Sequence, residues 1–305
     1  MPGVKFQTED IPDLTDQVIL VTGGNAGLGL ESIKQLRRHN PKRIYLAARS
    51  QEKANAAIEQ LNKEEPKFSS VPISFLSLDL TSFDSIKGAA ETFFSSESRL
   101  DILINNAGIM MTPEGLTKDG YEIQFGTNVL GPALFTQLLL PALETTAKLN
   151  SQTRVVTLSS DLESRAPGDV YKLDELKTTM ANRSSMARYG ISKLGGIHFS
   201  NAMAEEHPNL KFISVHPGVV QTNLHQNAKG FFLKPFLNIM MNFFAVPVEK
   251  GALSQLWAAV SPDAKSGEYY APIGLRGKGS KASKDTKLQQ SIYQWIQQEL
   301  SPHLT

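Results

Sequence analysis

Residues 18–30 read VILVTGGNAGLGL. The first four residues are apolar and predict a short strand, and the residues from the glycines to about position 39 predict a turn and a helix. A glycine has no Cβ, so the backbone at Gly23, Gly27 and Gly29 can turn tightly and let a phosphate approach its N–H groups. The positive end of the helix dipole points to the same place. This order of strand, turn and helix predicts the pyrophosphate site of a dinucleotide-binding sheet, and a tight turn without a ligand is the alternative.

The composition limits the classes of protein to which the chain can belong. Of its 305 residues, 41% are hydrophobic and 20% are charged, which suits a globular protein with one large core or at most two domains. The formal net charge of +1 provides no overall field to attract nucleic acid or an anionic membrane. Cysteine is absent, which excludes disulfides, thiolate catalysis and cysteine-based metal sites. No grouping of His, Asp and Glu has the spacing of a metal site, so we expect no metal.

The distribution of apolar residues bears on the location of the protein. Residues 1–16 carry several charged side chains and no apolar run, so we expect no secretory signal. A helix that spans a bilayer needs about 18 or more consecutive apolar residues, and no such run occurs, so we expect no transmembrane segment. A cytoplasmic location is the simplest interpretation.

Strand and helix patterns alternate along the rest of the chain with short connections. This alternation predicts an α/β protein with a single doubly wound parallel sheet of about seven strands, helices on both faces, and one Rossmann-type domain over 1–305. The expected strands after the first cover residues 43–48, 73–78, 100–104, 154–158, 212–215 and 268–270. The expected helices after the first cover residues 51–63, 83–96, 118–149, 186–206, 248–260 and 285–300.

The end of the strand at 43–48 bears on the choice of cofactor. Many folds that bind NAD place an Asp or Glu there to hold the ribose 2′-OH, whereas this chain has Ala47, Ala48 and Arg49. No carboxylate would repel a 2′-phosphate and the guanidinium could grip one, so we expect NADP rather than NAD. The alternative is that Arg49 is merely solvated beside Ser50, which is a good cap for the following helix.

Small and polar residues follow the next two strands. Asp79 and Leu80 come after the strand at 73–78, where an adenine ring would lie against the sheet edge, and Asp79 could also cap the helix at 83–96. The strand at 100–104 runs into the turn Asn-Asn-Ala-Gly at 105–108. Small side chains keep this turn low, so we expect a flat ring system to lie over it, and a bare turn is the alternative.

The expected helix at 118–149 contains Asn128, followed closely by Gly131 and Pro132. Proline cannot donate a hydrogen bond to the preceding turn, so we expect the helix to be disturbed near Asn128. An amide side chain at such a position could serve freed backbone groups or hold a water.

Tyr189 and Lys193 are four residues apart and therefore share one face of the helix at 186–206. The pKa of a free tyrosine is about 10, and an ammonium about 4 Å away would favour the phenolate by ~4 kcal/mol at an effective dielectric constant of about 20. This makes Tyr189 a candidate general acid or base. Ser160 follows the strand at 154–158 and could hydrogen-bond a substrate oxygen. An exposed helical pair is the alternative for Tyr189 and Lys193.

These residues together resemble the short-chain dehydrogenase/reductase family, in its retinol-dehydrogenase-like branch. The resemblance covers about residues 18–223 and has the spacing of the family. The matching segments are Thr22–Gly29 (TGGNAGLG), Asn105–Gly108 (NNAG), Asn128, Ser159 and Ser160, Tyr189–Lys193 (YGISK), and Pro217 and Gly218 with Thr222.

The resemblance implies a hydride transfer between nicotinamide and a carbonyl or alcohol carbon. It implies that Tyr189 moves the proton, that Lys193 holds the nicotinamide ribose and lowers the pKa of Tyr189, and that Ser160 orients the substrate. It further implies that Asn128 holds a water, and it leaves Ser159 as the substitute for Ser160. The residues expected to contact the cofactor are Gly23, Asn25, Gly27, Leu28, Gly29, Arg49, Asp79, Leu80, Asn106, Ala107, Gly108, Tyr189, Lys193, Pro217, Gly218, Val220 and Thr222.

Residues 223–248 correspond to the variable part of the family, and phenylalanine and methionine crowd positions 231–244. We expect a substrate lid that packs partly on the core, and flexible methionines suit bulky apolar ligands. Core packing alone and a peripheral contact with a membrane are the alternatives. The resemblance also makes a homodimer possible, paired through the helices at 118–149 and 186–206.

We therefore expect an NADP(H)-dependent oxidoreductase with a hydrophobic, bulky carbonyl or alcohol substrate. One alternative is an enzyme of another class, such as an epimerase or cyclase, that keeps its NADP bound. The other is a nucleotide-sensing protein of the same fold that binds NADP and converts nothing.

Overall fold

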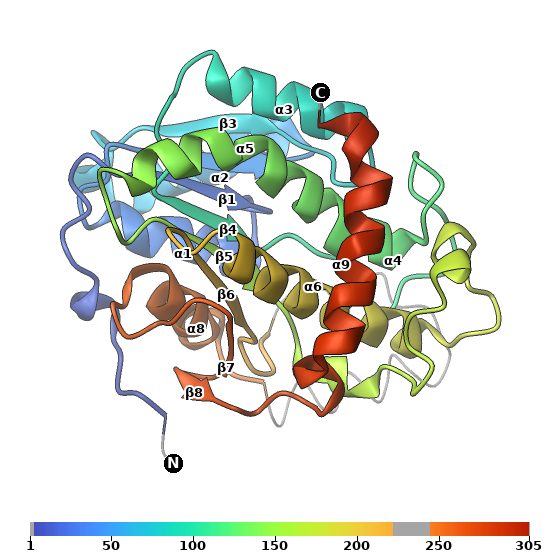
Figure 1. The fold of residues 1–305 in the computed structure, drawn as a ribbon. Coiled ribbons are helices and arrows are strands. Elements are labelled where there is room, and N and C mark those ends of the chain that lie inside the picture. The colour runs from blue at the N-terminus through green and yellow to red at the C-terminus, as the bar shows by residue number, and fades with distance from the viewer. Residues whose placement is uncertain (1–2, 222–244, 305) are drawn as a thin grey trace.

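The computed structural model describes residues 3–221 and 245–304 and consists of a central sheet between two layers of helices (Figure 1). The first strand and helix lie where the glycine-bearing sequence predicts them. The strands of the first half are β1 Val18–Thr22, β2 Arg43–Ala48, β3 Ile73–Ser77 and β4 Ile102–Asn105. Those of the second half are β5 Arg154–Leu158, β6 Lys211–Val215, β7 Glu268–Ala271 and β8 Leu275–Arg276.

The sheet has the strand order β3-β2-β1-β4-β5-β6-β7-β8. All neighbouring strands run parallel except β7 and β8. The α/β class and the doubly wound sheet are confirmed, but the sheet has eight strands rather than about seven. The extra strand, β8, comprises two residues after a turn at Gly274, which is too short to produce an alternating pattern in the sequence.

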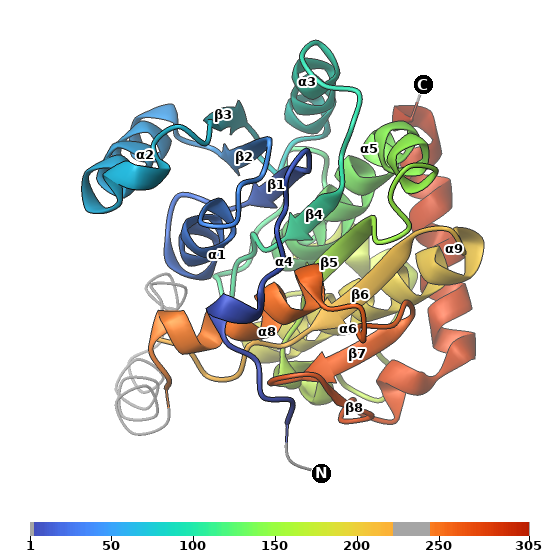
Figure 2. The same ribbon diagram turned by 90° about the vertical axis from the view of Figure 1, so that its left-hand side faces the viewer.

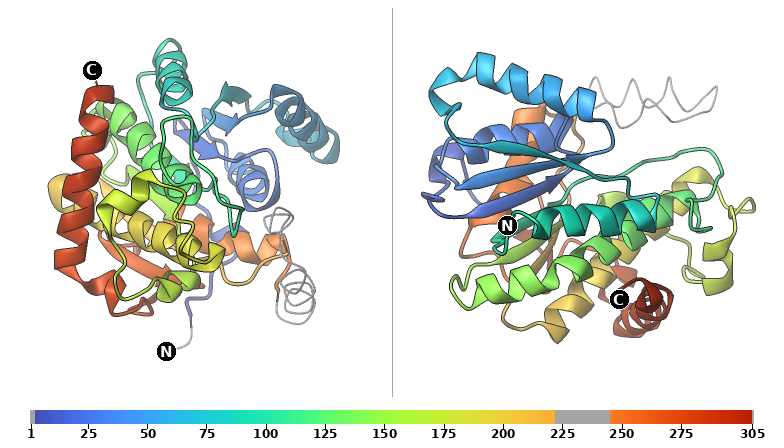
Figure 3. Two further views of the ribbon diagram at one scale, coloured as in Figure 1. Left: turned by 90° about the vertical axis from the view of Figure 1, so that its right-hand side faces the viewer. Right: turned by 90° about the horizontal axis from the view of Figure 1, so that it is seen from above.

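The helices divide between the two faces of the sheet, as Figure 2 shows. Helices α1, α2 and α8 pack on one face, and α3, α5, α6 and α9 pack on the other, each over its own buried apolar cluster. Figure 3 shows α9 along the outer side of α6, with which it is in contact. Their bounds are α1 Gly27–Arg37, α2 Gln51–Glu64, α3 Phe83–Phe94, α5 Gly131–Ala147, α6 Ser185–Glu206, α8 Val248–Val260 and α9 Thr286–Leu300.

The segment predicted as one helix at 118–149 has three parts in the structure. A short α4 Ile123–Phe125 leads into a π-helical turn at Gly126–Leu130 and then into α5. The N–H of Gly131 donates to the carbonyl of Gly126, five residues back, and Pro132 has no N–H to donate. The predicted disturbance at Asn128 is therefore confirmed, whereas the start at 118 was wrong because Leu116 and Glu122 pair as an isolated bridge.

Much of the predicted lid lies outside the described residues. The structure does not describe its residues 223–244, which include the apolar cluster at 231–244. Thr222, a predicted cofactor contact just before the lid, also lies outside the described residues. The residues on either side are described, and Val220 pairs with Val246 in an isolated parallel bridge. The segment therefore leaves and rejoins the described part of the chain at neighbouring points, next to the start of α8.

Candidate active site

The carboxyl ends of β1 and β4 lie side by side, at the point where the strand order reverses. Gly23 follows β1 with φ of +66°, and a Cβ on it would lie 3.1 Å from the Cα of Ala107. A Cβ on Gly29, in the first turn of α1, would lie 2.5 Å from the carbonyl oxygen of Gly23. The N-cap of α1 is Ala26, whose methyl group offers no acceptor for the first amides of the helix. The glycines are thus required by the close packing of this turn against the 105–108 turn, and the first amides of α1 have no side-chain cap.

The turn after β4 is tied to the end of β1 by two hydrogen bonds. The side-chain amide of Asn106 donates to the carbonyl of Thr22 at 2.8 Å. The backbone N–H of Ala107 donates to the hydroxyl of Thr22 at 3.0 Å. These bonds keep the small residues of the 105–108 turn low against the sheet edge, as the sequence predicts.

The side chain of Asn128 bonds to a neighbouring segment, not to its own helix. Its Oδ1 accepts from the backbone N–H of Ile109 at 2.9 Å, and its Nδ2 donates to the carbonyl of Ile109 at 2.9 Å. The same Nδ2 lies 2.9 Å from the hydroxyl of Ser192 on α6. Asn128 therefore connects the π-helical turn, the segment after β4 and α6.

Tyr189 and Lys193 lie on the face of α6 that meets these segments, and both are buried. The Nζ of Lys193 is 5.7 Å from the centre of the Tyr189 ring and donates to the carbonyl of Leu158 at 2.8 Å. A Cβ on Gly108 would lie 3.5 Å from this Nζ and 3.1 Å from the Oδ1 of Asn128. The fold thus brings together a phenol, an amine and an amide beside the 105–108 turn.

The two serines after β5 have different surroundings. The hydroxyl of Ser159 is buried and donates to the carbonyl of Lys193 at 2.8 Å, so it ties β5 to α6. Ser160 is half-buried and caps the 3₁₀ turn Asp161–Arg165, its hydroxyl accepting from the N–H of Leu162 at 3.2 Å. The hydroxyl of Ser160 donates to the carboxylate of Asp161 at 3.2 Å, and it lies near enough to the phenol of Tyr189 to affect its pKa. The geometry favours Ser160, the first choice from the sequence, as the serine that faces the phenol.

Burial dominates the electrostatics of this site. It raises the pKa of Tyr189 above its usual value, and the nearby hydroxyl of Ser160 opposes this in part. It lowers the pKa of Lys193 to about 8. The expectation that the ammonium lowers the pKa of Tyr189 is not met by the chain alone, because both groups have lost their water and the amine donates to a backbone carbonyl.

The model of the short chain dehydrogenase family matches residues 17–171. A short-chain dehydrogenase/reductase of Armillaria gallica is 41% identical over 97% of this chain and 94% of its own length. The chain belongs to the short-chain dehydrogenase/reductase family. Human retinol dehydrogenase 14 is 36% identical to this chain, over 83% of this chain and 77% of the human protein. The retinol-dehydrogenase-like resemblance is therefore confirmed.

Solved structures share the fold over most of the chain. The structure of an uncharacterized protein of Mycobacterium paratuberculosis has a TM-score of 0.74 and 26% identity, and covers 97% of each chain. The NADPH-bound carbonyl reductase from chicken fatty liver has a TM-score of 0.64 at 22% identity, over 87% of this chain and 99% of its own. At that identity the second likeness concerns the fold alone.

In this family member, Arg49 is exposed at the end of β2. Ser50 caps α2, as the alternative interpretation supposed, and its hydroxyl accepts from the N–H of Lys53 at 3.2 Å. The cap involves Ser50 alone, so it leaves the Arg49 guanidinium free of any capping role. Asn25, Gly27 and Leu28 are half-buried in the glycine turn and the start of α1; the carbonyl of Leu28 accepts from the side chain of Gln255.

Asp79 lies at the end of β3 beside Leu80, which is buried. Its carboxylate accepts from the N–H and the hydroxyl of Thr81, at 3.0 and 2.8 Å, and pairs with Lys118 at 3.3 Å. The cap of α3 is Ser82, so the interpretation of Asp79 as the helix cap was wrong. An aspartate two residues before a threonine closes a local turn instead.

After β6, Gly218 has φ of +85°, and its N–H donates to the Nδ1 of His216 at 3.0 Å. Pro217 precedes it, and Val220 is buried where it pairs with Val246. Among the described residues, no cluster of three or more acidic or histidine side chains could hold a metal ion. Within 3–221 and 245–304, no helix is long and apolar enough to cross a membrane.

The sequence reasoning missed two features of the site. One is Ser192, which bonds Asn128 and could have been found because it lies inside the YGISK motif. The other is a small apolar cluster, whose members come from three segments that lie close in sequence to Gly108, Ser160 and Tyr189. Its members are Met110, Met111, Leu162 and Met186.

Proposed function

We propose that the protein is an NADP(H)-dependent oxidoreductase that moves a hydride between the nicotinamide and a carbonyl or alcohol carbon. The main support for this proposal is that one region beside Gly108 brings together Tyr189, Lys193, Ser160 and Asn128. This region lies at the carboxyl edge of the sheet, next to the glycine turn. Four polar side chains from three segments, three of them hardly exposed, are an arrangement that acid–base chemistry requires.

The site suits a dinucleotide, because the uncapped start of α1 follows the glycine turn at the carboxyl end of β1, next to β4, where the strand order reverses. We assign the 2′-phosphate to Arg49, which makes NADP the preferred cofactor. When bound, the nicotinamide supplies or takes up the hydride. The further residues that would hold the cofactor are Asn25, Gly27, Leu28, Asp79, Leu80, Asn106, Ala107, Gly108, Pro217, Gly218, Val220 and Thr222, of which Thr222 lies outside the described residues.

Tyr189 would exchange a proton with the substrate oxygen, and Ser160 would hold that oxygen by a hydrogen bond. Burial raises the pKa of Tyr189, so the phenol carries its proton at neutral pH, which is the state that donation to a carbonyl oxygen requires. Lys193 would hold the nicotinamide ribose. Both N–H groups of the Asn128 amide are used, so the free lone pair of its Oδ1 is the place we assign to a water.

A hydrophobic, bulky substrate is supported by the methionine-rich cluster, whose members follow Gly108 and Ser160 and precede Tyr189 closely in the chain. Met110, Leu162 and Met186 are only half-buried there, around a buried Met111 with φ of +49°. Flexible thioethers adapt to irregular apolar ligands, and a strained backbone at a non-glycine residue is typical of functional sites. The segment 223–248 stays our proposed lid.

The test is a set of ketones of increasing apolar size, with NADPH oxidation followed by absorbance. We expect bulky apolar ketones to be reduced and small polar ketones to react poorly. Tyr189→Phe should lower kcat by 10³-fold or more and change the Kd for NADPH less than about 3-fold, because only the proton donor is removed.

The matched control is Tyr293→Phe, which removes another buried hydroxyl, bonded to Glu206 at the far end of α6. It should keep kcat. Unchanged turnover in Tyr189→Phe would refute the role of the phenol, and NADPH binding without any turnover would favour a nucleotide-sensing protein or a non-redox enzyme.

Three further proposals come from the sequence alone. They are a single domain over 1–305, a homodimer and a cytoplasmic location. Sedimentation of the purified chain tests the dimer, and fluorescence microscopy of the tagged protein tests the location.

A further inference from the structure

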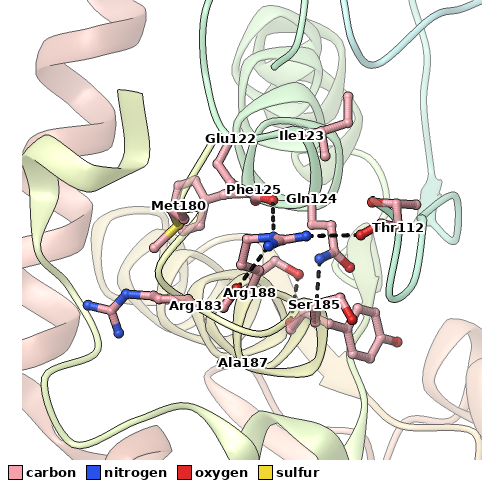
Figure 4. A network of polar contacts seen from close by, with 12 residues as sticks. Thr112, Glu122, Ile123, Gln124, Phe125, Met180, Arg183, Ser185, Ala187 and Arg188 are labelled. Atoms are coloured by element: carbon pink, nitrogen blue, oxygen red, sulfur yellow. Dashed lines mark hydrogen bonds and ion pairs between the residues drawn. The ribbon is translucent and has the colours of Figure 1, made fainter. Parts of the chain in front are cut away.

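Arg188, the residue directly before Tyr189, is only 3% exposed. A buried guanidinium needs partners for its donors. Its Nη2 donates to the carbonyl of Thr112 at 3.0 Å, and its Nη1 donates to the carbonyl of Arg183 at 2.9 Å (Figure 4). Its Nε lies 3.2 Å from the Oε1 of Glu122 as an ion pair. One side chain thus connects α6 with the residues just before it and with two segments that are distant in sequence.

Glu122 is fully buried and starts the helical segment that contains Asn128. Its Oε2 accepts from the N–H of Phe125 at 2.7 Å and so caps α4, while its Oε1 faces Arg188. Burial raises the pKa of Glu122 to about 7, and the hydrogen bond from Phe125 and the charge of Arg188 oppose this rise. The carboxylate therefore depends on the arginine for a charged partner.

A second contact joins the same two helices. The side-chain amide of Gln124 donates to the carbonyl of Ser185, in the first turn of α6, at 3.0 Å (Figure 4). The start of α6 is therefore held against α4 by an ion pair and by a neutral hydrogen bond.

These contacts close a ring of segments that includes Arg188, the residue directly before Tyr189. From Arg188 the ring passes to Glu122 and along α4 to Asn128, whose amide bonds both backbone groups of Ile109. From Ile109 it runs along the chain to Thr112, whose carbonyl accepts from Arg188 again. The segment 109–112 also contributes Met110 and Met111 to the apolar cluster.

Tyr189 lies between two ties of α6 to this ring. Arg188 is tied on one side, and Ser192, bonded to Asn128, is tied on the other. We propose that Glu122 and Arg188 are positioning residues, whose ion pair fixes Tyr189 relative to Asn128 and to the apolar wall at 109–112. This inference rests on the proposed function, in which Tyr189 is the proton donor.

The test compares Arg188 with a matched buried arginine. Arg154 is 1% exposed and donates to the carbonyls of Gln152, Ala258 and Ser261, at the opposite end of β5 from the site. We would prepare Arg188→Met, Arg188→Lys and Glu122→Gln, together with Arg154→Met and Arg154→Lys. For each, kcat with a bulky ketone, the Kd for NADPH and the thermal midpoint are measured.

We expect both Met variants to lower the thermal midpoint, and only Arg188→Met to lower kcat, by 10- to 100-fold with the Kd for NADPH within about 3-fold. Arg188→Lys and Glu122→Gln should each retain more of kcat than Arg188→Met does. The first variant keeps the positive charge, and the second keeps the cap on α4. Unchanged kcat in a folded Arg188→Met, or an equal loss in Arg154→Met, overturns the inference. Should neither Met variant fold, the same comparison between the Lys variants decides.

Hydrogen exchange separates a failure of this inference from a failure of the proposed function. Arg188→Met or Arg188→Lys should speed exchange in residues 109–112 and 123–130 together, whereas the Arg154 variants should leave both segments unchanged. If the unmodified protein reduces no ketone, the proposed function fails and the exchange pattern still tests the ring. Faster exchange confined to 183–188 would overturn it.

Discussion

Tyr189 and Lys193 each lose solvent on folding, and each pKa shifts against the charged form. For the phenol this shift keeps the proton in place at neutral pH and makes Tyr189 a weaker acid than a free tyrosine. For the amine, a pKa of about 8 leaves the charge in place at neutral pH, but only by a small margin. At the scale of single residues, burial therefore sets the protonation states before any cofactor contributes.

Arg49 provides the residue-scale prediction on cofactor choice. We expect Arg49→Ala to weaken NADPH binding by about 10- to 100-fold, the range for loss of a charge-assisted hydrogen bond, and NADH binding by less than about 3-fold. Titration of protein fluorescence with each nucleotide measures both. Lys63→Ala, which removes an exposed cation near the far end of α2, is the control for the general field. Equal losses for the two nucleotides would mean that Arg49 does not contact the phosphate.

At the scale of elements, α6 carries Tyr189 and Lys193 and is fitted closely against the 3₁₀ turn Asp161–Arg165. A Cβ on Gly190 would lie 2.8 Å from the N of Ala166 and 2.8 Å from the carbonyl oxygen of Leu162, which are backbone atoms next to the 3₁₀ turn Asp161–Arg165. A Cβ on Gly196, further along the same helix, would make an ordinary contact at 3.6 Å with Thr157. Of these two positions, only Gly190 requires a glycine, because backbone atoms of a neighbouring turn approach it closely.

Gly190→Ala should lower the free energy of unfolding by about 1–3 kcal/mol, because the backbone of the 3₁₀ turn must move. It should also lower kcat, since that turn begins directly after Ser160. Gly196→Ala should leave stability unchanged or raise it by up to about 1 kcal/mol through helix propensity. Urea unfolding of both variants measures the difference, and equal stabilities would show that the packing at Gly190 is looser than described.

At the scale of the whole molecule, His198 joins three distant segments. Its Nδ1 lies 2.9 Å from the hydroxyl of Tyr171, after β5, and its Nε2 lies 2.9 Å from the carbonyl of Ala282, before α9. The carbonyl requires a proton on Nε2, so Nδ1 accepts from the tyrosine and the ring is neutral. Burial lowers the pKa of His198 to about 4.

This shift predicts a loss of stability in mild acid. The unfolded chain takes up a proton near pH 6.5 and the folded chain only near pH 4, so the unfolded state binds more protons within this window. The stabilisation is present above pH 6.5 and is lost as the pH falls, by about 2 kcal/mol between pH 7 and 5. Urea unfolding of the protein and of His198→Gln over this range measures the change, and curves that stay parallel would contradict the shift.

The sequence alone was sufficient to predict features that depend on the order and spacing of residues within one segment. The glycine turn, the NNAG turn and the Tyr189/Lys193 spacing each lie within one segment, and alternation of strands and helices predicts the doubly wound sheet. The disturbance of the helix near Asn128 followed from Pro132, because a missing N–H is a property of the residue itself, whereas its π-helical form did not. The pattern of the sequence failed to predict the role of Asp79, which bonds the hydroxyl of Thr81 instead of capping α3. It also failed to predict β8, which pairs with β7 through only two residues.

The tertiary structure decided everything that joins separate segments. That Asn128 serves Ile109, that Ser159 ties β5 to α6, and that Arg188 pairs with Glu122 depend on distances between parts of the chain that no periodicity encodes. The protonation of Tyr189 and Lys193 also belongs here, because burial is a property of the packed molecule. The sequence by itself determined the family, the fold and the chemical groups, and packing determined how those groups are held and charged.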